Sequence, residues 1–261
     1  MNKQLLKKID KWPNLFIPGA AKSGTSSLHA YLGMHPAITT SRDKEPAFFN
    51  DSENFHQRKP YYLNLFEEKP NSVYRAESST AYMTSSVAIQ NIKRYTNQPK
   101  FIFILRNPID RAFSHYKWLK NLGYENLDFD SAISQAISSQ KPKGDEFIPF
   151  GDKQYFRNGL YAFWISTFVN VFGIENINVI TTERLKKDPL KALNICFRFL
   201  EIDPFEYVEP LLFNYTDNQS ASKMSKLIDR MLYDKKLSSI KKWYATIFSG
   251  KQRIELRNRV K

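Results

Sequence analysis

The fold of this chain is decided by one stretch near its N-terminus, Ile17-Pro18-Gly19-Ala20-Ala21-Lys22-Ser23-Gly24-Thr25-Ser26-Ser27-Leu28. The apolar run 15–17 predicts a short buried strand in front of this loop. After the loop, Leu28, Tyr31 and Leu32 recur at helical spacing. A strand that enters a helix through a loop rich in glycine and hydroxyl groups directs backbone N–H groups and the helix N-terminus toward one point, where Lys22 adds a positive charge. The stretch therefore predicts a phosphate-binding loop in an α/β fold.

The order of residues in this loop differs from that of a Walker A loop. A Walker A loop has its lysine after the second glycine, whereas Lys22 precedes Gly24 here. This order argues against an ordinary ATP or GTP site. An alternative interpretation is a plain turn in which Thr25 or Ser26 serves as the N-cap of the helix.

A second strand-to-helix junction carries a similar combination of charge and hydroxyl groups. The apolar run 100–105 is typical of an inner strand of a parallel sheet, and Pro108 suits the first turn of the helix that follows. Arg106 then lies at the carboxyl end of the strand, and Ser114 lies on the second turn of the helix. An arginine and a hydroxyl group in these places can bracket a phosphate dianion. The alternative is that Arg106 and Arg111 are merely solvated.

Together the two loops resemble those of the sulfotransferases that use 3′-phosphoadenosine 5′-phosphosulfate (PAPS). In that family a K-[ST]-G-T-[ST] loop binds the 5′-phosphosulfate, and L-R-[DN]-P-x-x-R-x-x-S-x-[YF] binds the 3′-phosphate. Every specified position of the longer motif is matched, by Leu105, Arg106, Asn107, Pro108, Arg111, Ser114 and Tyr116. The resemblance implies that the cofactor is bound by Lys22, Ser23, Gly24, Thr25, Ser26, Ser27, Arg106, Ser114, Tyr161 and Lys223.

The resemblance extends over much of the chain and implies its architecture. It covers about Asn14 to Ile202 and becomes vague beyond Pro204. We therefore expect one sulfotransferase-like domain over residues 1–261, with a core at roughly 14–202 and a basic helical portion at 203–261. Its fold class would be α/β, a three-layer domain with a mainly parallel central sheet. We also expect a helix from Gln154 to Val171 and surface loops at 51–59 and 138–151.

The candidate base is Glu45. The segment 42–49 resembles the family segment K-E-x-x-F-F, whose glutamate is the base in the heparan-sulfate-type branch. Such a base is needed because the acceptor must lose a proton as it attacks sulfur. Lys22 is the second catalytic candidate, since it would neutralise charge on the leaving phosphate oxygen. The alternative for Glu45 is a surface carboxylate paired with Arg42 or Lys44.

A neighbouring segment departs from the family pattern. Residues 75–82 resemble E-x-[ST]-P-x-Y, but Thr80 replaces the proline and Ser78 stands where heparan-type enzymes have a catalytic lysine. Whether Lys44 replaces that lysine stays open. Ser78 and Ser79 are candidate hydroxyl groups facing the acceptor or the cofactor. Glu77 either orients a cation or is simply a carboxylate at a strand end.

Composition limits the remaining functional classes. The net charge is +13, of which +9 falls in residues 222–261. Such a tail could contact an anionic membrane or glycan, and the alternative is a solvated helical surface that keeps the protein soluble. No nucleic-acid-binding module is recognisable, so no nucleic acid is expected as a partner. The single cysteine, Cys196, and the lack of a secretory leader favour a cytoplasmic location. None of the four histidines is assigned as a base, and no ligand spacing suggests a metal.

These observations predict a PAPS-dependent sulfotransferase that acts by direct in-line transfer, without a metal. The acceptor would be a hydroxyl group or amine, expected on a carbohydrate or glycolipid. Two alternatives remain, a P-loop-type nucleotide kinase and a non-enzymatic polyanion-binding protein. A kinase should have an acidic Mg²⁺ ligand after an inner strand, but the strand at 100–105 ends in Arg106. The sulfated position on the acceptor and the oligomeric state are not determined by the sequence.

Overall fold

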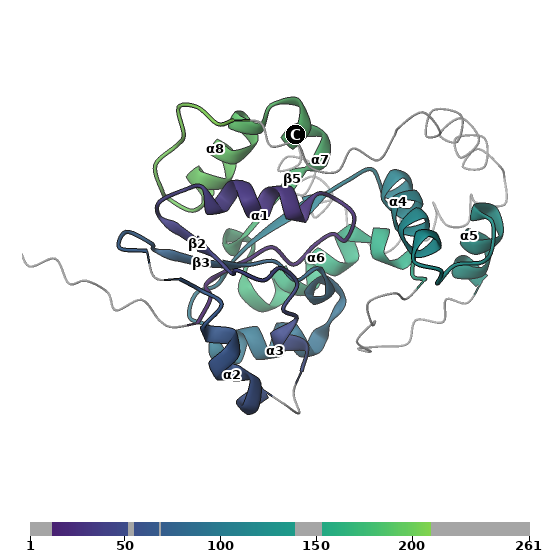
Figure 1. The fold of residues 1–261 in the computed structure, drawn as a ribbon, viewed down its shortest axis with the longest axis horizontal. Coiled ribbons are helices and arrows are strands. Elements are labelled where there is room, and N and C mark those ends of the chain that lie inside the picture. The colour runs from purple at the N-terminus through teal and green to yellow at the C-terminus, as the bar shows by residue number, and fades with distance from the viewer. Residues whose placement is uncertain (1–11, 52–54, 68, 139–152, 210–261) are drawn as a thin grey trace, which may run out of the picture.

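The computed structural model describes residues 12–51, 55–67, 69–138 and 153–209 of the 261-residue chain (Figure 1). Its centre is a five-stranded sheet in the order β2-β3-β1-β4-β5, with every pair of neighbours parallel. The strands are β1 (Leu15–Phe16), β2 (Ile38–Thr40), β3 (Tyr74–Glu77), β4 (Lys100–Leu105) and β5 (Ile177–Thr181). β1 and, after Lys100, β4 are continuous apolar runs, as expected for inner strands of a parallel sheet covered on both faces.

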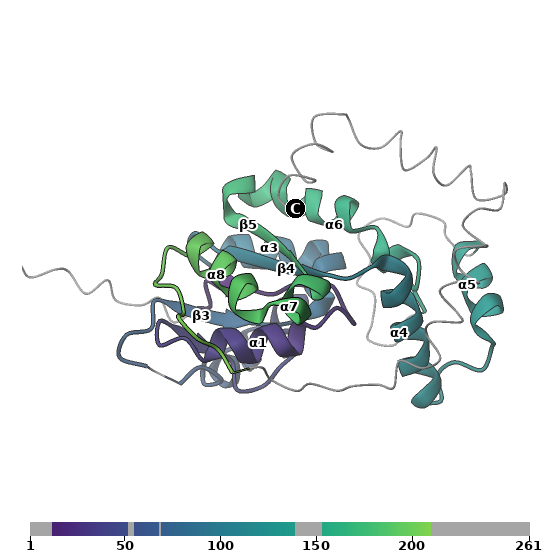
Figure 2. The ribbon, with the colours of Figure 1, turned by 90° about the horizontal axis from the view of Figure 1, so that it is seen from above.

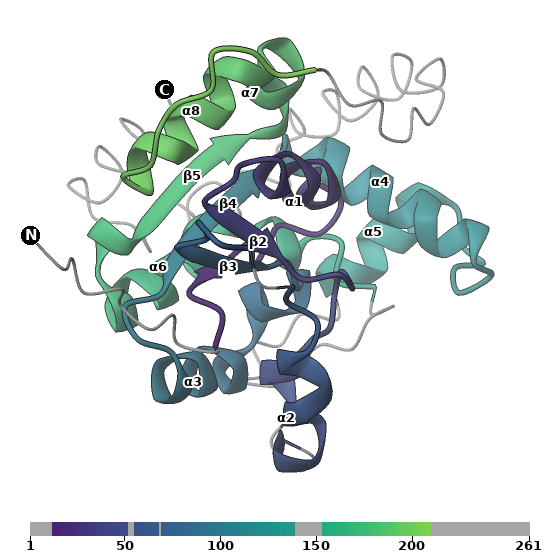
Figure 3. The ribbon, with the colours of Figure 1, turned by 60° about the vertical axis from the view of Figure 1, so that its left-hand side comes forward.

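Helices cover both faces of the sheet (Figure 3). Along β4, Phe101 and Phe103 pack with α3 (Ser86–Tyr95) and α6 (Tyr161–Phe172). Ile102 and Ile104 point the other way, toward α1 (Thr25–Gly33) and α8 (Pro189–Phe199). This alternation follows from the period of two along a strand. The prediction of a three-layer α/β fold with a parallel sheet is therefore confirmed, whereas the extent of one domain over residues 1–261 stays a prediction.

A smaller cluster lies beside the sheet. It consists of α4 (Pro108–Asn121) and α5 (Phe129–Ser138), which pack around Leu119, Phe129 and Tyr155 (Figure 2). The other helices are α2 (Phe55–Leu63) and α7 (Thr182–Lys187), with single 3₁₀ turns η1 (Phe48–Asn50), η2 (Thr80–Thr84), η3 (Arg157–Gly159) and η4 (Ile174–Asn176). In the part of the chain that the structure describes, no helix has both the length and the apolar character needed to cross a bilayer.

Two sequence expectations about these elements were wrong. The helix expected from Gln154 begins only at Tyr161, because Leu160 has a non-helical ψ of 57° and the preceding residues form η3. The loop expected at 51–59 contains the start of α2, whose buried Phe55 and Tyr62 are seven residues apart and therefore lie on one face. Residues 139–152, where a loop was also expected, lie outside the described residues.

The strand order brings two loops together at one edge of the sheet. β1 lies between β3 and β4, so successive strands are added on one side of β1 before β4 and then on the other side. Ligands of such sheets bind at the carboxyl ends of the strands where this order switches. The loop after β1 is joined directly to β4, because Ala20 N donates to Ile104 O at 2.8 Å and Ile104 N donates to Gly19 O at 2.9 Å. The loops after β1 and β4 are therefore neighbours.

Candidate active site

The loop after β1 has the geometry of an anion cradle. α1 begins at Thr25 with Gly24 as its N-cap, and Gly24 has a φ of 92°, where a side chain would be strained. Since Gly24 is the cap, the alternative in which Thr25 or Ser26 caps the helix is wrong. Ser23 is fully buried, and its hydroxyl group lies near that of Tyr161. The N-terminal amides of α1 and this hydroxyl group suit an anionic ligand.

Lys22 lies among other cations in this loop. It is half-buried with a left-handed φ of 67°, and its Nζ lies 5.1 Å from the centre of the Trp118 ring. Burial lowers the pKa of Lys22, and the positive charges of Lys44 and Arg106 lower it further. Lys44 and Arg106 therefore each lie close enough to repel Lys22. An anion between them would relieve this repulsion.

The loop after β4 supplies Arg106. Asn107 caps α4, accepting at Oδ1 from Ile109 N at 3.0 Å, and Pro108 takes the first helical position, as expected. Tyr161 contacts this loop through its hydroxyl group, which donates to Arg106 O at 2.9 Å. Tyr161 thus holds the loop backbone at the candidate site. Ser114 lies on α4 and is half-buried.

A threonine that the sequence analysis missed joins the two loops. The hydroxyl group of Thr182 lies within hydrogen-bond distance of the carbonyl oxygens of Ser23 and Leu105, the latter at 3.0 Å. Thr182 is buried and directly follows β5, the strand next to β4. Its place at the carboxyl end of a parallel strand was the signal that could have identified it.

α4 also carries two buried titratable side chains, those of Arg111 and His115. Arg111 is completely buried and donates from Nη2 to Tyr155 O, so the alternative that Arg111 is merely solvated is wrong. Its Nε and Nη1 have no hydrogen-bond partner among the described residues. His115 lies one turn further along α4, and burial together with Arg111 and Lys22 lowers its pKa to about 3. His115 is therefore neutral at physiological pH.

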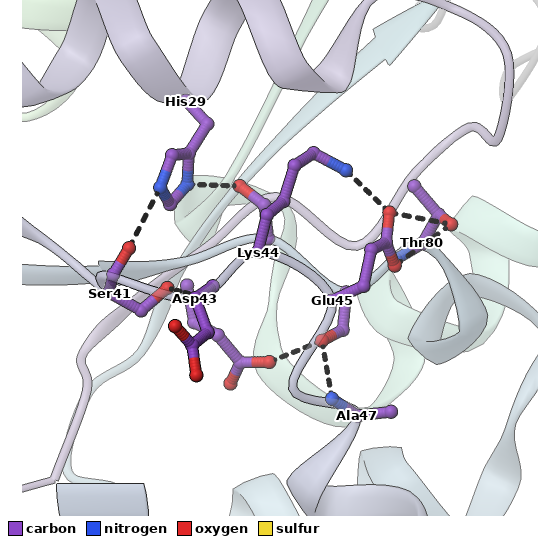
Figure 4. A network of polar contacts seen from close by, with 10 residues as sticks. His29, Ser41, Asp43, Lys44, Glu45, Ala47 and Thr80 are labelled. Atoms are coloured by element: carbon purple, nitrogen blue, oxygen red, sulfur yellow. Dashed lines mark hydrogen bonds and ion pairs between the residues drawn. The ribbon is translucent and has the colours of Figure 1, made fainter. Parts of the chain in front are cut away.

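Glu45 lies in the loop that follows β2 (Figure 4). Its Oε1 lies 2.5 Å from Nζ of Lys44, and its Oε2 accepts from Thr80 N at 2.7 Å. The pairing with Lys44 that the alternative interpretation described is therefore present. The side chains of Glu45 and Lys44 are 24% and 26% exposed, so the pair stays accessible from solvent. Glu45 has a left-handed φ of 59°, an uncommon conformation for a residue with a side chain.

Ser78 and Ser79 do not face solvent, because both are completely buried. The Oγ of Ser78 lies 2.8 Å from Nδ1 of His29. Nε2 of His29 lies 3.1 Å from Ser41 O (Figure 4). A carbonyl only accepts, so Nε2 carries the proton and Ser78 donates to Nδ1. Burial lowers the pKa of His29, which favours this neutral form. Ser79 donates to Glu77 Oε1 at 2.5 Å.

Glu77 is a completely buried carboxyl group at the end of β3. It accepts hydrogen bonds from Tyr62 and Ser79, so of its two interpretations the strand-end carboxylate is the one that fits. Burial raises the pKa of Glu77 to about 7, opposed by its hydroxyl partners and reinforced by the charge of Glu45.

The remaining residues of interest differ in how exposed they are. The aromatic residues Tyr62, Phe66 and Tyr82 are buried in the core. Tyr61 is 57% exposed and donates to Asp43 Oδ2 at 2.5 Å, beside the segment that carries Glu45. Lys223 lies outside the described residues. Among those described, no group of three or more His, Cys, Asp or Glu is arranged to hold a metal ion.

Comparison with protein families gives a match over most of the chain. Residues 13–250 match the family described as Sulfotransferase domain. Human bifunctional heparan sulfate N-deacetylase/N-sulfotransferase 2 is 27% identical over 218 residues, and the alignment covers 80% of this chain and 24% of that protein. Human N-deacetylase/N-sulfotransferase 1 is 27% identical over 222 residues with the same coverage. The chain thus spans about a quarter of the length of these relatives.

Solved structures agree with the fold. A sulfotransferase from Alicyclobacillus acidocaldarius superposes with a TM-score of 0.65 at 27% identity, over 84% of this chain and 92% of that one. Mouse sulfotransferase SULT7A1 complexed with PAP superposes with a TM-score of 0.50 at 22% identity, over 86% of this chain and 68% of that one. At this identity the second likeness concerns the fold alone.

Proposed function

The chain belongs to the sulfotransferase domain family, and we propose that it transfers a sulfuryl group from PAPS to an amine or hydroxyl group of a carbohydrate. The observation that carries this proposal is that Lys44 and Arg106 both lie near Lys22, in the glycine loop that begins α1. A nucleotide with phosphate groups at both its 3′ and 5′ positions would present separate anions to the two neighbouring loops. A kinase is less well supported, because the residue after β4 is Arg106 rather than a Mg²⁺-binding carboxylate.

The donor set fits such a nucleotide. The N-terminal amides of α1 and the buried Ser23 hydroxyl group suit phosphosulfate oxygens. Arg106 and Ser114 would hold the 3′-phosphate, the group that distinguishes PAPS from ATP. Tyr161 would act on this subsite through the loop backbone, since its hydroxyl group donates to Arg106 O.

Different residues of the chain would then take different roles in sulfuryl transfer. PAPS supplies the activated sulfuryl group and leaves as the bisphosphate. Lys22 would stabilise the negative charge that develops on the phosphate oxygen of the leaving nucleotide. Glu45 would take the proton of the acceptor, and Lys44 would keep the Glu45 carboxylate oriented through the 2.5 Å contact at Oε1. Lys44 thus supplies a cation near the place where Ser78 replaces the lysine of heparan-type enzymes.

For the acceptor we propose a glycan that carries free amino groups. The relatives named above act, by their names, as heparan sulfate N-sulfotransferases. The exposed Tyr61 ring beside the Glu45 segment offers a surface on which a sugar ring could pack. A glycolipid acceptor, contact with an anionic membrane and a cytoplasmic location stay predictions.

The test is calorimetric titration with adenosine 3′,5′-bisphosphate, beside ATP with and without Mg²⁺. We expect bisphosphate to bind more tightly than either form of ATP, and transfer from radiolabelled PAPS to N-desulfated heparan sulfate to exceed transfer to its N-acetylated form. Preference for Mg-ATP would favour a kinase. If neither nucleotide binds and heparan sulfate binds with a steep salt dependence, the protein is a polyanion-binding protein.

A further inference from the structure

The buried carboxyl group of Glu77 is the centre of a hydrogen-bond network that the proposed reaction does not use. Tyr62 donates to its Oε2, and Ser79 donates to its Oε1 at 2.5 Å. The hydroxyl group of Tyr82 is also hydrogen-bonded to it. These groups come from α2, from the residue just before η2, and from η2 itself. All four side chains are at most 1% exposed.

Two of these hydroxyl groups also accept hydrogen bonds from the loop after Glu45. Ala47 N donates to Ser79 Oγ at 2.9 Å, and Phe49 N donates to the Tyr82 hydroxyl group at 3.1 Å. A hydroxyl group has one proton. When that proton is directed at Glu77, the oxygen lone pairs remain free for the loop amides. The carboxylate therefore fixes the direction of both hydroxyl groups.

The loop that these amides belong to needs outside support. Glu45 and Ala47 have left-handed φ values of 59° and 49°, which are costly for residues with side chains and persist only when neighbouring groups hold them. Glu45 N donates to Ser78 O at 2.9 Å, and Glu45 Oε2 accepts from Thr80 N at 2.7 Å. The backbone that follows Glu77 thus meets the segment that carries the candidate base.

We propose that Glu77 is a positioning residue, whose ionised carboxyl group holds the 45–49 loop through Ser79 and Tyr82 and thereby fixes Glu45 for proton transfer. The role in proton transfer rests on the proposed function; the effect on the loop does not. Glu77 itself is too deeply buried to touch the acceptor.

Protonation of Glu77 would disturb this arrangement. A carboxylic acid has a proton of its own to donate, and the acceptors within reach are the hydroxyl oxygens of Tyr62, Ser79 and Tyr82. The last two are the oxygens that hold Ala47 N and Phe49 N. The groups facing Glu77 are Tyr62 from α2, Ser79 and Tyr82 around η2, and the carboxylate of Glu45. Because burial raises the pKa of Glu77 to about 7, this change falls within the physiological range, and kcat should rise with pH through about 7.

The experiment compares Glu77→Gln and Ser79→Ala with Ser72→Ala. Ser72 is a matched control, since it is buried, lies just before the other end of β3, and donates to a backbone carbonyl, Tyr74 O, at 2.9 Å. The first readout is amide hydrogen exchange at residues 47 and 49, which needs neither nucleotide nor acceptor. We expect exchange there to accelerate about 10-fold or more in Glu77→Gln and Ser79→Ala, and to stay unchanged in Ser72→Ala.

The second readout is kinetic, with PAPS and N-desulfated heparan sulfate. We expect kcat to fall about 10-fold or more in Glu77→Gln and Ser79→Ala while KM for PAPS is unchanged, and the pH step near 7 to vanish in Glu77→Gln. Wild-type exchange at both amides in folded Ser79→Ala would overturn the inference, whatever the activity. Accelerated exchange with wild-type kcat, or a pH step that persists in Glu77→Gln, would also overturn it. Absence of transfer by the wild-type protein would instead count against the proposed function.

Discussion

The two halves of the candidate site are built in different ways. The phosphosulfate half is one contiguous loop, in which Gly24 and the N-terminus of α1 present backbone amides and Lys22 adds charge. The base half depends on residues far apart in the sequence. Thr80 N donates to the carboxylate of Glu45. The loop that follows Glu45 is held by hydroxyl groups that contact the buried carboxyl group of Glu77. The first can be recognised from a short motif. The second depends on hydrogen-bond directions that only the folded chain defines.

The largest expected effect lies in the contiguous half. Lys22→Ala should lower kcat roughly 10²- to 10³-fold, because it removes a preorganised cation from the charge that develops on the leaving group. Steady-state assays with saturating PAPS would measure this. Lys59→Ala is the matched control, since Nζ of Lys59 also lies 5.1 Å from an aromatic ring centre, that of Trp12, but outside the loop. Near-normal turnover of Lys22→Ala would remove the lysine from the mechanism.

The second prediction separates stability from activity in the buried half. The pKa of Glu77 rises from 4.5 to about 7 on folding, so its contribution to stability is fully present below pH 4.5 and is lost as pH rises through about 7. Relative to Glu77→Gln, the wild-type free energy of unfolding should therefore fall on the order of 3 kcal/mol between pH 5 and pH 8. Urea denaturation at the two pH values measures it. Parallel pH dependence of the two proteins would show that Glu77 does not titrate in this range.

The third prediction concerns the 3′-phosphate subsite. Arg106→Ala should weaken binding of adenosine 3′,5′-bisphosphate by about 2 kcal/mol, or roughly 30-fold in Kd, the magnitude of a hydrogen bond between charged groups. Calorimetry measures the change. Adenosine 5′-monophosphate, which lacks the 3′-phosphate, is the control ligand, and its affinity should change much less. Equal losses of affinity for both nucleotides would mean that Arg106 does not contact the 3′-phosphate.

The smallest effect tests the link between the loops. Thr182→Val should cost about 1–2 kcal/mol of stability and weaken bisphosphate binding a few-fold, because it removes the hydroxyl group shared by Ser23 O and Leu105 O. Thr39→Val is the control, since Thr39 is also buried but its Oγ1 has no hydrogen-bond partner among the described residues. Thermal denaturation and calorimetry would compare them. Equal effects of the two substitutions would show that the link is unimportant.

The sequence predicted what depends on short spacing. The runs 15–17 and 100–105 located two strands, and Pro108 located the start of α4, because apolar continuity and the fixed φ of proline act locally. The sequence did not predict features that depend on tertiary contacts. α2 has Pro60 within it and is tied to the core by Phe55 and Tyr62, so its composition resembled a loop. The burial of Arg111 and Ser78 was missed for the same reason, since neither residue type is ordinarily enclosed.

The contact between Lys22 and Trp118 gives the protein an optical reporter of its own. Indole emission responds to the electric field of a charge placed over the ring, and Nζ of Lys22 lies 5.1 Å from the ring centre. A polyanion that draws this ammonium group away from the ring alters that field. The tryptophan therefore makes occupancy of the loop visible in the steady-state fluorescence of the unlabelled chain, and Trp118→Phe identifies its share of the signal.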